Sequence, residues 1–400
     1  MKKGWEIKKM GEVLTIERGG SPRPIEKYMT NSPDGINWIK ISDATASEKY
    51  IYETKEKITK DGLHKTRVVN EGDFILSNSM SFGRPYIMKT TGCIHDGWLV
   101  LKQNGEKIFE SEFLYYLLSS PFVFQQFNSK AAGSTVRNLN IALVSSVNVP
   151  IPPLPEQQHI VVILDEVFGA IAKAKANAEQ NLKNVKELFD VYLHKFYTSK
   201  EEGWEEKKLK EVAEYFNGLT YSPKNVSNEG IIVLRSSNVQ NDVLDFKDIV
   251  RVNLNVKEKI IVKEGDILMC SRNGSARLVG KTATIKNLNE EMTFGTFMMI
   301  VRSQYNPYLS WFFKSTDFRN QIKGGGNTMI NQITRYMLDD VVISFPPIEK
   351  QNEVVQKLNA LHLEIKKLEA IYQQKINDLE ELKKSVLQKA FAGELKEDLK

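Results

Sequence analysis

The feature that most constrains this chain is an internal repeat, because its sequence is written twice. Gly4-Trp5-Glu6 reappears as Gly203-Trp204-Glu205, and residues 152–197 align without a gap with residues 346–391. These 46 aligned pairs include 13 identities. The chain is therefore a tandem duplication of a unit of about 200 residues. A repeat of this length is a duplicated domain rather than a solenoid unit.

Each copy consists of two parts, of which the first is predicted to be a globular head. The heads, residues 1–151 and 204–345, mix short apolar runs with Gly, Asn, Ser and Pro. Runs such as Gly72–Leu76 and Gly230–Leu234 are typical of short strands separated by turns. Two segments with aromatic apolar faces are predicted to be helices: Phe109–Phe127 and Pro307–Ile322. We expect each head to be a mixed, strand-rich α/β domain.

The second part of each copy, residues 152–203 and 346–400, is predicted to be one long helix that follows a Pro-Pro pair. In the first helix, apolar residues recur in steps of three and four with one stutter: Ile160, Leu164, Val167, Ile171, Ala174, Ala178, Leu182, Val185, Phe189, Tyr192 and Phe196. Ten of the eleven positions 194 residues later are also apolar, and Lys383 is the exception. Two seams with one register predict that the two helices pair as a coiled coil. Two copies related by a pseudo-two-fold axis need their helices to pair antiparallel. Packing of each helix on its own head is the alternative.

Composition narrows the function less than the repeat does. The chain has 55 Lys and Arg against 50 Asp and Glu, a net charge of +5, which permits nucleic-acid binding without requiring it. It contains no apolar stretch of membrane-spanning length and no N-terminal segment typical of a signal peptide. Two cysteines are too few for a disulfide scaffold or a cysteine zinc site. We therefore expect a cytoplasmic protein with no membrane partner.

Several short motifs occur in the same order in both copies: Trp5 with Glu12-Val13 and Trp204 with Glu211-Val212; Glu71-Gly72-Asp73 and Glu264-Gly265-Asp266; Gly133-Ser134-Thr135 with Asn138 and Gly326-Asn327-Thr328 with Asn331; Pro152–Gln158 and Pro346–Gln351; and the final stretch Gln388–Leu395. Together they resemble the specificity subunit of type I restriction–modification systems, over essentially the whole chain. The resemblance implies a target-recognition domain at 1–151, a central conserved spacer helix at 152–203, a second target-recognition domain at 204–345 and a C-terminal conserved spacer helix at 346–400.

The resemblance also implies function and partners. Each head would read one half of a bipartite, asymmetric site on double-stranded DNA, and the helices would set the spacing and dock two methyltransferase subunits. Restriction subunits would then join to form an ATP-dependent endonuclease. No catalytic residue, metal or cofactor is expected on this chain, with S-adenosylmethionine, ATP and magnesium held by the partner subunits.

Candidate DNA-contacting residues lie in loops that combine glycine with basic and small polar side chains. Lys and Arg neutralise phosphates, whereas Arg, Asn, Ser and Thr can read base edges. The candidates are Ser77, Asn78, Ser79, Arg84, Lys130, Ser134, Thr135 and Arg137 in the first copy, and Arg235, Asn238, Arg272, Asn273, Arg277, Lys323 and Asn327 in the second. Arg84, Arg272 and Arg277 have no match between the copies. They are therefore the better candidates for sequence specificity.

Two other functions remain open from the sequence. Asp34, Glu53 and Lys55 spell a pattern that could hold a metal in a stand-alone nuclease, and a two-headed protein–protein adaptor needs no DNA. The segment Gly274–Thr282 has one residue too many between its glycines for a phosphate-binding loop, and a strand is predicted after it. His95 beside Asp96 could act as a general base, but a turn or core role is favoured because no nucleophile is placed near it.

Overall fold

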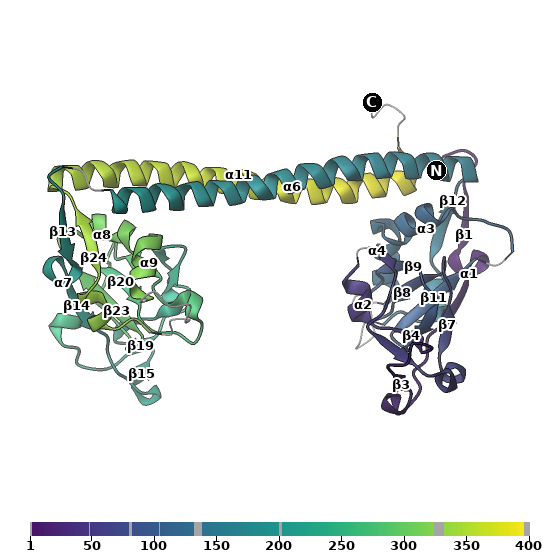
Figure 1. Cartoon of the computed structure of the whole chain (residues 1–400), viewed down its shortest axis with the longest axis horizontal. Coiled ribbons are helices and arrows are strands. Elements are labelled where there is room, and N and C mark those ends of the chain that lie inside the picture. The colour runs from purple at the N-terminus through teal and green to yellow at the C-terminus, as the bar shows by residue number, and fades with distance from the viewer. Residues whose placement is uncertain are drawn as a thin grey trace. The chain divides into compact units, whose positions relative to one another are not determined.

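The computed structural model describes residues 2–47, 49–79, 82–103, 105–131, 138–199, 202–323 and 332–395. The chain divides into two compact units (Figure 1). Unit 1 comprises residues 1–178 and 374–400, and unit 2 comprises residues 179–373. Each unit contains one head together with a part of each long helix, α6 (Leu154–Thr198) and α11 (Ile348–Ala392).

Head 1 of unit 1 is built on two five-stranded sheets. One has the order β2-β11-β8-β9-β5, with β2 at Thr15–Arg18, β5 at Tyr50–Ile51, β8 at Phe74–Ser77, β9 at Pro85–Met88 and β11 at Trp98–Lys102. The other has the order β3-β6-β4-β10-β7, with β3 at Met29–Thr30, β4 at Ile36–Ile39, β6 at Glu56–Ile58, β7 at Arg67–Val69 and β10 at Gly92–Ile94. A separate antiparallel pair, β1 (Glu6–Lys9) with β12 (Asn148–Ile151), brings both ends of the head to the start of α6.

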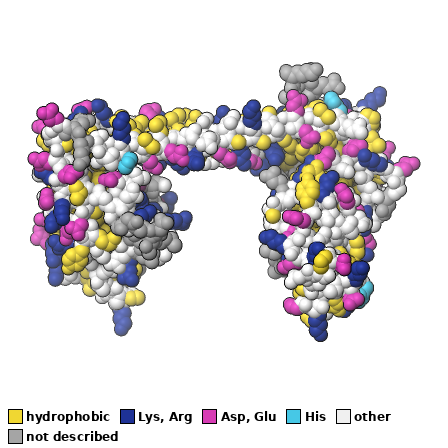
Figure 2. All heavy atoms as spheres, viewed as in Figure 1, with side chains coloured by type: hydrophobic (Ala, Val, Ile, Leu, Met, Phe, Trp, Pro, Cys, Tyr) yellow, Lys and Arg dark blue, Asp and Glu magenta, His cyan; other side chains and the backbone are white. Residues whose placement is uncertain are grey.

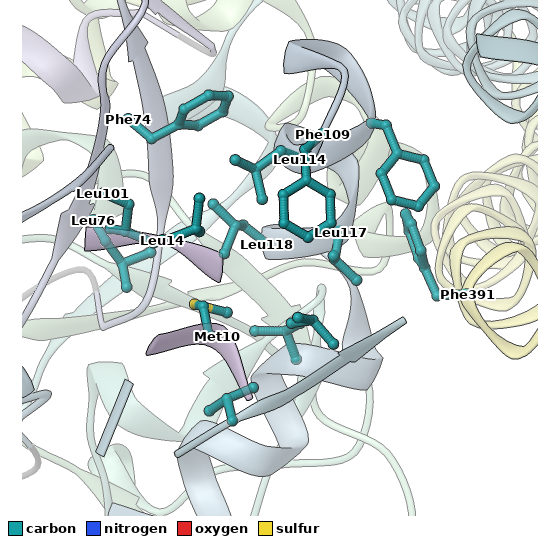
Figure 3. Close-up of a cluster of buried hydrophobic side chains, with 14 of the residues drawn as sticks. Met10, Leu14, Phe74, Leu76, Leu101, Phe109, Leu114, Leu117, Leu118 and Phe391 are labelled. Carbon is teal, nitrogen blue, oxygen red and sulfur yellow. The ribbon is translucent and has the colours of Figure 1, made fainter. Parts of the chain in front are cut away.

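Among the short helices of head 1, α2 (Ile41–Thr45) packs on a separate apolar cluster. Other short helices close the core against the long helices: α1 (Met10–Val13), α3 (Ser111–Leu118), α4 (Pro121–Ala131) and α5 (Ile141–Ser145). Figure 3 shows their apolar side chains converging with those of the strands. Phe391 of α11 reaches this cluster, and its ring lies 5.3 Å from that of Phe113. The head is therefore joined to the helix pair by a continuous apolar core.

Unit 2 repeats this plan with four strands in each of its two main sheets. Its strands form the sheets β14-β23-β20-β21 and β15-β19-β16-β22 and the pairs β13-β24 and β17-β18. Their bounds are β13 Glu205–Lys208, β14 Glu214–Asn217, β15 Val226–Ser227, β16 Ile231–Leu234, β17 Val239–Gln240, β18 Val243–Leu244, β19 Arg251–Val252, β20 Ile267–Cys270, β21 Thr282–Thr284, β22 Met292–Phe294, β23 Met298–Arg302 and β24 Val342–Phe345. The short helices are α7 (Leu209–Val212), α8 (Asn306–Phe312), α9 (Thr316–Ile322) and α10 (Arg335–Asp339). The prediction of two strand-rich α/β heads is confirmed.

Two of the repeated motifs have a structural explanation. In each Glu-Gly-Asp motif the glycine adopts a positive φ, +89° at Gly72 and +83° at Gly265, which glycine tolerates best. Asp73 then accepts a hydrogen bond from the backbone N–H of Asn70 (2.8 Å), and Asp266 closes the equivalent turn. The motif is thus a tight turn leading into a buried strand of each head.

The glutamine after each Pro-Pro pair holds the beginning of a long helix. Gln157 is fully buried, and its Nε2 donates to the carbonyl oxygens of Pro152 and Ile108, both at 2.9 Å. Gln351 is also buried and donates to the carbonyl of Pro346 (2.8 Å). These bonds explain why the same motif opens α6 and α11.

The long helices pair antiparallel in each unit, as predicted. In unit 1, Lys383 lies over the Phe168 ring (5.2 Å) and Glu380 pairs with Lys175 (2.5 Å). Residue numbers therefore decrease along α11 in the direction in which they increase along α6. In unit 2, Phe189 of α6 contacts His362 of α11 at 5.6 Å. Most residues of the predicted seam are buried or half-buried; Tyr192, Leu368 and Lys383 are exposed.

The two predicted aromatic helices are each broken into two, which corrects the sequence analysis. Residues 109–127 form α3 and α4, and residues 307–322 lie in α8 and α9. At each break a buried serine caps the next helix: Ser120 accepts from the N–H of Val123 (3.3 Å) and Ser315 from that of Phe318 (3.2 Å). Aromatic periodicity continued through the breaks and concealed them.

Candidate nucleic-acid interface

The loops that carry most of the predicted DNA contacts meet at one edge of a sheet in head 1. Strand β11 lies between β2 and β8 and is antiparallel to both. The C-terminal ends of β2 and β8 therefore lie beside the start of β11. Asn78 ties these loops together: its Nδ2 donates to the carbonyl of Asp96 (2.7 Å), and its own carbonyl accepts from the N–H of Leu139 (2.8 Å).

Head 2 has the same arrangement around β23, which lies between β14 and β20. Ser271 donates its N–H to the carbonyl of Phe297 (2.9 Å) and accepts from the N–H of Ile333 (2.7 Å). We call these clusters the recognition edges, defined by residues 19–24, 78–79, 82–84, 95–97 and 138–139 in head 1 and by residues 218–222, 271–278, 295–297 and 332–333 in head 2.

Two predicted contacts in head 1 have buried side chains. Ser77 and Asn78 are 0% and 1% exposed, and Ser77 Oγ accepts from the backbone N–H of Arg84 (3.1 Å). We therefore assign them to holding the loop rather than touching bases. Ser79 is half-buried, whereas Arg84 and Lys130 are exposed. Four further predicted contacts lie outside the described residues: Ser134, Thr135, Arg137 and Asn327.

Arg235 and Asn238 in head 2 are also held in a local network. Asn238 is 1% exposed; its Oδ1 accepts from the N–H of Arg235 (2.9 Å), and the Arg235 guanidinium pairs with Asp248 (2.7 Å). Head 1 repeats this network with Lys40 and Asp43, where the carboxylate accepts from the Lys40 N–H (2.9 Å). The repetition indicates that Asn238 stabilises a turn and leaves only part of Arg235 for a ligand.

The exposed basic side chains of the head 2 recognition edge lie in the loop after β20. Arg272 is exposed and stacks over Phe297 at 5.6 Å, and Phe297 is itself 57% exposed. Asn273 is half-buried and bonded to Ser236 Oγ (3.2 Å), while Arg277 is exposed. Lys323, at the end of α9, is exposed as well. An exposed guanidinium beside an aromatic ring suits contact with bases or phosphates.

The loop that follows the second strand of each head, β2 in head 1 and β14 in head 2, was not among the predicted contacts. In head 1 it borders a cavity of about 1120 Å³ whose lining includes Arg23, Trp38, Lys40 and His95. The internal repeat could have indicated this loop, because Gly19 and Gly218 are 199 positions apart, the same separation as Gly4 and Gly203. The glycines permit a close approach: a Cβ at Gly19 would lie 2.1 Å from the carbonyl oxygen of His95.

His95 is a turn residue, as the sequence analysis favoured. Its Nδ1 accepts a hydrogen bond from the N–H of Gly97 (2.9 Å), so that nitrogen carries no proton to share with Asp96. Burial lowers the pKa of His95, and a hydrogen bond from Ser21 lowers the pKa of Asp96. The pair is a neutral imidazole beside a carboxylate that is bonded elsewhere.

The described residues assemble no metal or phosphate-loop chemistry. Asp34, Glu53 and Lys55 are exposed, and the described part of the chain holds no group of three or more His, Cys, Asp or Glu that could bind a metal. The segment Gly274–Thr282 contains a single 3-10 turn at Ala276–Leu278 and then leads into β21, as predicted. Burial raises the pKa of the Cys93 thiol to about 11, which makes it unreactive.

The long helices present a second candidate surface, made of apolar side chains directed away from the seam. In unit 2, Leu188, Val191 and Leu363 are 66%, 62% and 61% exposed. Hydrophobic side chains are visible along this part of the helices in Figure 2. Leu382 in unit 1, which is 194 positions after Leu188, is 47% exposed. Equivalent exposed leucines suit a protein partner that binds each unit in the same way.

Comparison with known proteins agrees with this two-headed plan. The family model described as "Type I restriction modification DNA specificity domain" matches twice, at residues 2–183 and 201–381. The chain belongs to this family. It is 28% identical over 310 residues to the EcoKI specificity subunit of Escherichia coli, covering 72% of this chain and 67% of that protein. It is 22% identical to the MjaVIII specificity subunit of Methanocaldococcus jannaschii, covering 98% and 93%.

Solved structures share the fold. A chain from a type I restriction–modification assembly matches with a TM-score of 0.81 at 19% identity, covering 98% of this chain and 99% of that one. The HsdS subunit from Thermoanaerobacter tengcongensis matches with a TM-score of 0.61 at 20% identity, covering 99% and 98%. As a member of the type I restriction modification DNA specificity family, this chain recognises DNA and is not itself an enzyme. In the described part of the chain, no helix has the length and apolar content needed to cross a bilayer.

Proposed function

We propose that each recognition edge reads one half of a bipartite, asymmetric site on double-stranded DNA. The observation that carries this proposal is the equivalent construction of the two edges with different side chains at corresponding positions. Counted from the Glu-Gly-Asp turn of each head, Ser79 in head 1 corresponds to Arg272 in head 2. A shared scaffold with different side chains would bind two half-sites of different sequence.

The helix pair would set the spacing of the half-sites and dock two methyltransferase subunits. The exposed leucines at equivalent positions, Leu188 and Leu382, support one docking site in each unit. Restriction subunits would complete an endonuclease complex. S-adenosylmethionine, ATP and magnesium would then act on the partner subunits.

The direct test is to map methylated adenines genome-wide in cells that carry this chain with its methyltransferase partner. We expect a two-part asymmetric motif. In the variant Arg272→Ala, we expect methylation to relax or weaken at one half of that motif, while the other half stays fully specified. Loss of a good guanine contact costs about 1–3 kcal/mol at that position.

Arg272→Lys is the matched variant, because it keeps the charge and removes the planar bidentate donor. A single continuous palindrome in the parent map would contradict two separate reading heads. Equal weakening on all sequences in the Arg272→Ala complex would instead assign that residue to a phosphate. Metal-dependent cleavage by the isolated chain would favour the nuclease alternative and overturn the proposal.

A further inference from the structure

Unit 1 contains a groove where head 1 meets the helix pair. It has a volume of about 720 Å³ and is bounded by the loop that ends at Arg84, by α3 and α4, and by both long helices. Figure 2 shows hydrophobic side chains gathered over α4 below the helices. Phe82 and Phe124 contribute to this wall, with their rings 6.2 Å apart. The groove adjoins the recognition edge, because the same loop belongs to both.

The groove is strongly basic. Its charged lining consists of Lys49, Arg84, Lys175, Lys383, Lys384 and a single acid, Glu380. Three of the lysines have acidic partners, since Lys49 pairs with Glu112, Lys175 with Glu380 and Lys384 with Glu381. Arg84 and Lys383 make no ion pair within the described residues.

Each of these two cations lies over an aromatic ring. Arg84 is 5.3 Å from the ring of Tyr86, and Lys383 is 5.2 Å from that of Phe168. Both side chains are exposed. They contribute two positive charges to the lining of one groove, one from the head and one from α11.

Lys383 is the one residue of the apolar seam that is not apolar, and unit 2 shows which side chain occupies the equivalent position. The equivalent position, 194 residues earlier, is Phe189. Its ring packs on Trp311 and His362, both at 5.6 Å, and the corresponding groove is only about 340 Å³. A lysine in place of this ring gives up apolar packing and leaves a larger groove in unit 1. The unit 1 groove has one acid in its lining, Glu380, where the unit 2 groove has three: Asp190, Asp242 and Glu369. Packing therefore does not explain Lys383.

We propose that the groove of unit 1 binds backbone phosphates of the DNA that head 1 reads, with Lys383 and Arg84 as the phosphate-binding residues. This inference rests on the proposed function. DNA is favoured over an acidic protein surface because Arg84 belongs to a loop of the recognition edge. A duplex lying on that edge would bring its phosphates to the mouth of the groove. The contact would be sequence-independent and confined to one end of the site.

The test uses the full chain assembled with its methyltransferase partner and the variant Lys383→Leu. Binding is measured between 50 and 200 mM salt on a duplex carrying the recognised site and on an unrelated duplex. We expect weaker binding to both duplexes and a salt slope lower by about 0.9, as for one lost phosphate contact. The unfolding temperature should stay the same or rise, because leucine restores the seam. Arg84→Ala should lower the slope similarly, whereas Lys389→Ala, on the exposed face of α11 outside the groove, should not.

Three results would overturn the inference. If the parent complex binds its site normally and Lys383→Leu has the same affinity and salt slope, Lys383 makes no phosphate contact. Weakening on the recognised duplex alone would make Lys383 part of base reading. Loss of the methyltransferase partner with an unchanged slope would assign the groove to a protein surface. Failure of the parent complex to bind any specific duplex is a separate outcome, which would contradict the proposed function itself.

Discussion

At the scale of single residues, burial separates the predicted contacts into two kinds. Asn78 and Asn238 have the residue type and loop context of base-reading side chains, yet both are buried and bonded to backbone groups. Arg272 has the same context and is exposed. Sequence gives residue type and turn propensity, but a buried amide that closes a turn looks the same as one that faces DNA. The stacked partner Phe297 could not be predicted, because only strand pairing brings it beside Arg272.

The glycine of the loop after β14 gives a prediction at this scale. A Cβ at Gly218 would lie 2.2 Å from the carbonyl oxygen of Gly295, which is backbone and cannot move aside easily. We expect Gly218→Ala to destabilise head 2 by about 1–3 kcal/mol through overpacking. Chemical denaturation followed by circular dichroism measures the change. Gly274→Ala is the control, because no atom lies within 4 Å of its Cβ; an equal loss there would show that the close approach is not the cause.

At the scale of elements, periodicity predicted the long helices well and the short ones poorly. The seam of α6 and α11 extends over many turns, so the burial of one stripe dominates the free energy and can be read from the sequence. The aromatic segments are shorter, and one serine hydroxyl decides where each divides. Ser120 and Ser315 occupy equivalent breaks. A serine at the same place in both copies is a helix N-cap signal that could have located the two breaks.

The packing of α11 against α6 and α8 should depend on pH. His362 lies between Phe189 and Trp311, its Nδ1 is buried without a hydrogen-bond partner in the described structure, and burial with Lys314 and Lys366 lowers its pKa. Its pKa is therefore below the unfolded value of about 6.5. As the pH falls below about 6.5 the unfolded chain binds more protons, so this contribution to stability is present at neutral pH and lost in acid.

We expect the variant His362→Phe, which copies Phe168 at the equivalent position, to lose less stability than the parent between about pH 7 and pH 5. Unfolding temperatures across this range measure the difference. His194→Phe, at an exposed position of α6, is the matched control and should follow the parent curve. A parallel fall in the parent and His362→Phe would mean that other groups cause the acid sensitivity.

At the scale of the whole molecule, the duplication means that each copy contains a head and a long helix. The seams of α6 and α11 share one register, so the helix of one copy should be able to pair with the same helix from a second molecule. The fragment 1–203 should then form a two-fold symmetric dimer. Its heads would be identical, and the DNA half-sites they read would be identical too.

We therefore expect cells carrying fragment 1–203 with the methyltransferase partner to methylate an interrupted palindrome made of one half of the parent motif. Fragment 204–400 should yield the palindrome of the other half. Methylation mapping identifies the sites, and light scattering on the purified fragments establishes the dimer. A dimeric, folded fragment that still methylates the parent asymmetric motif would break the link between copy and half-site. A folded fragment that stays monomeric would instead show that residues unmatched between the seams, such as Lys383 opposite Phe168, specify pairing of the two different helices.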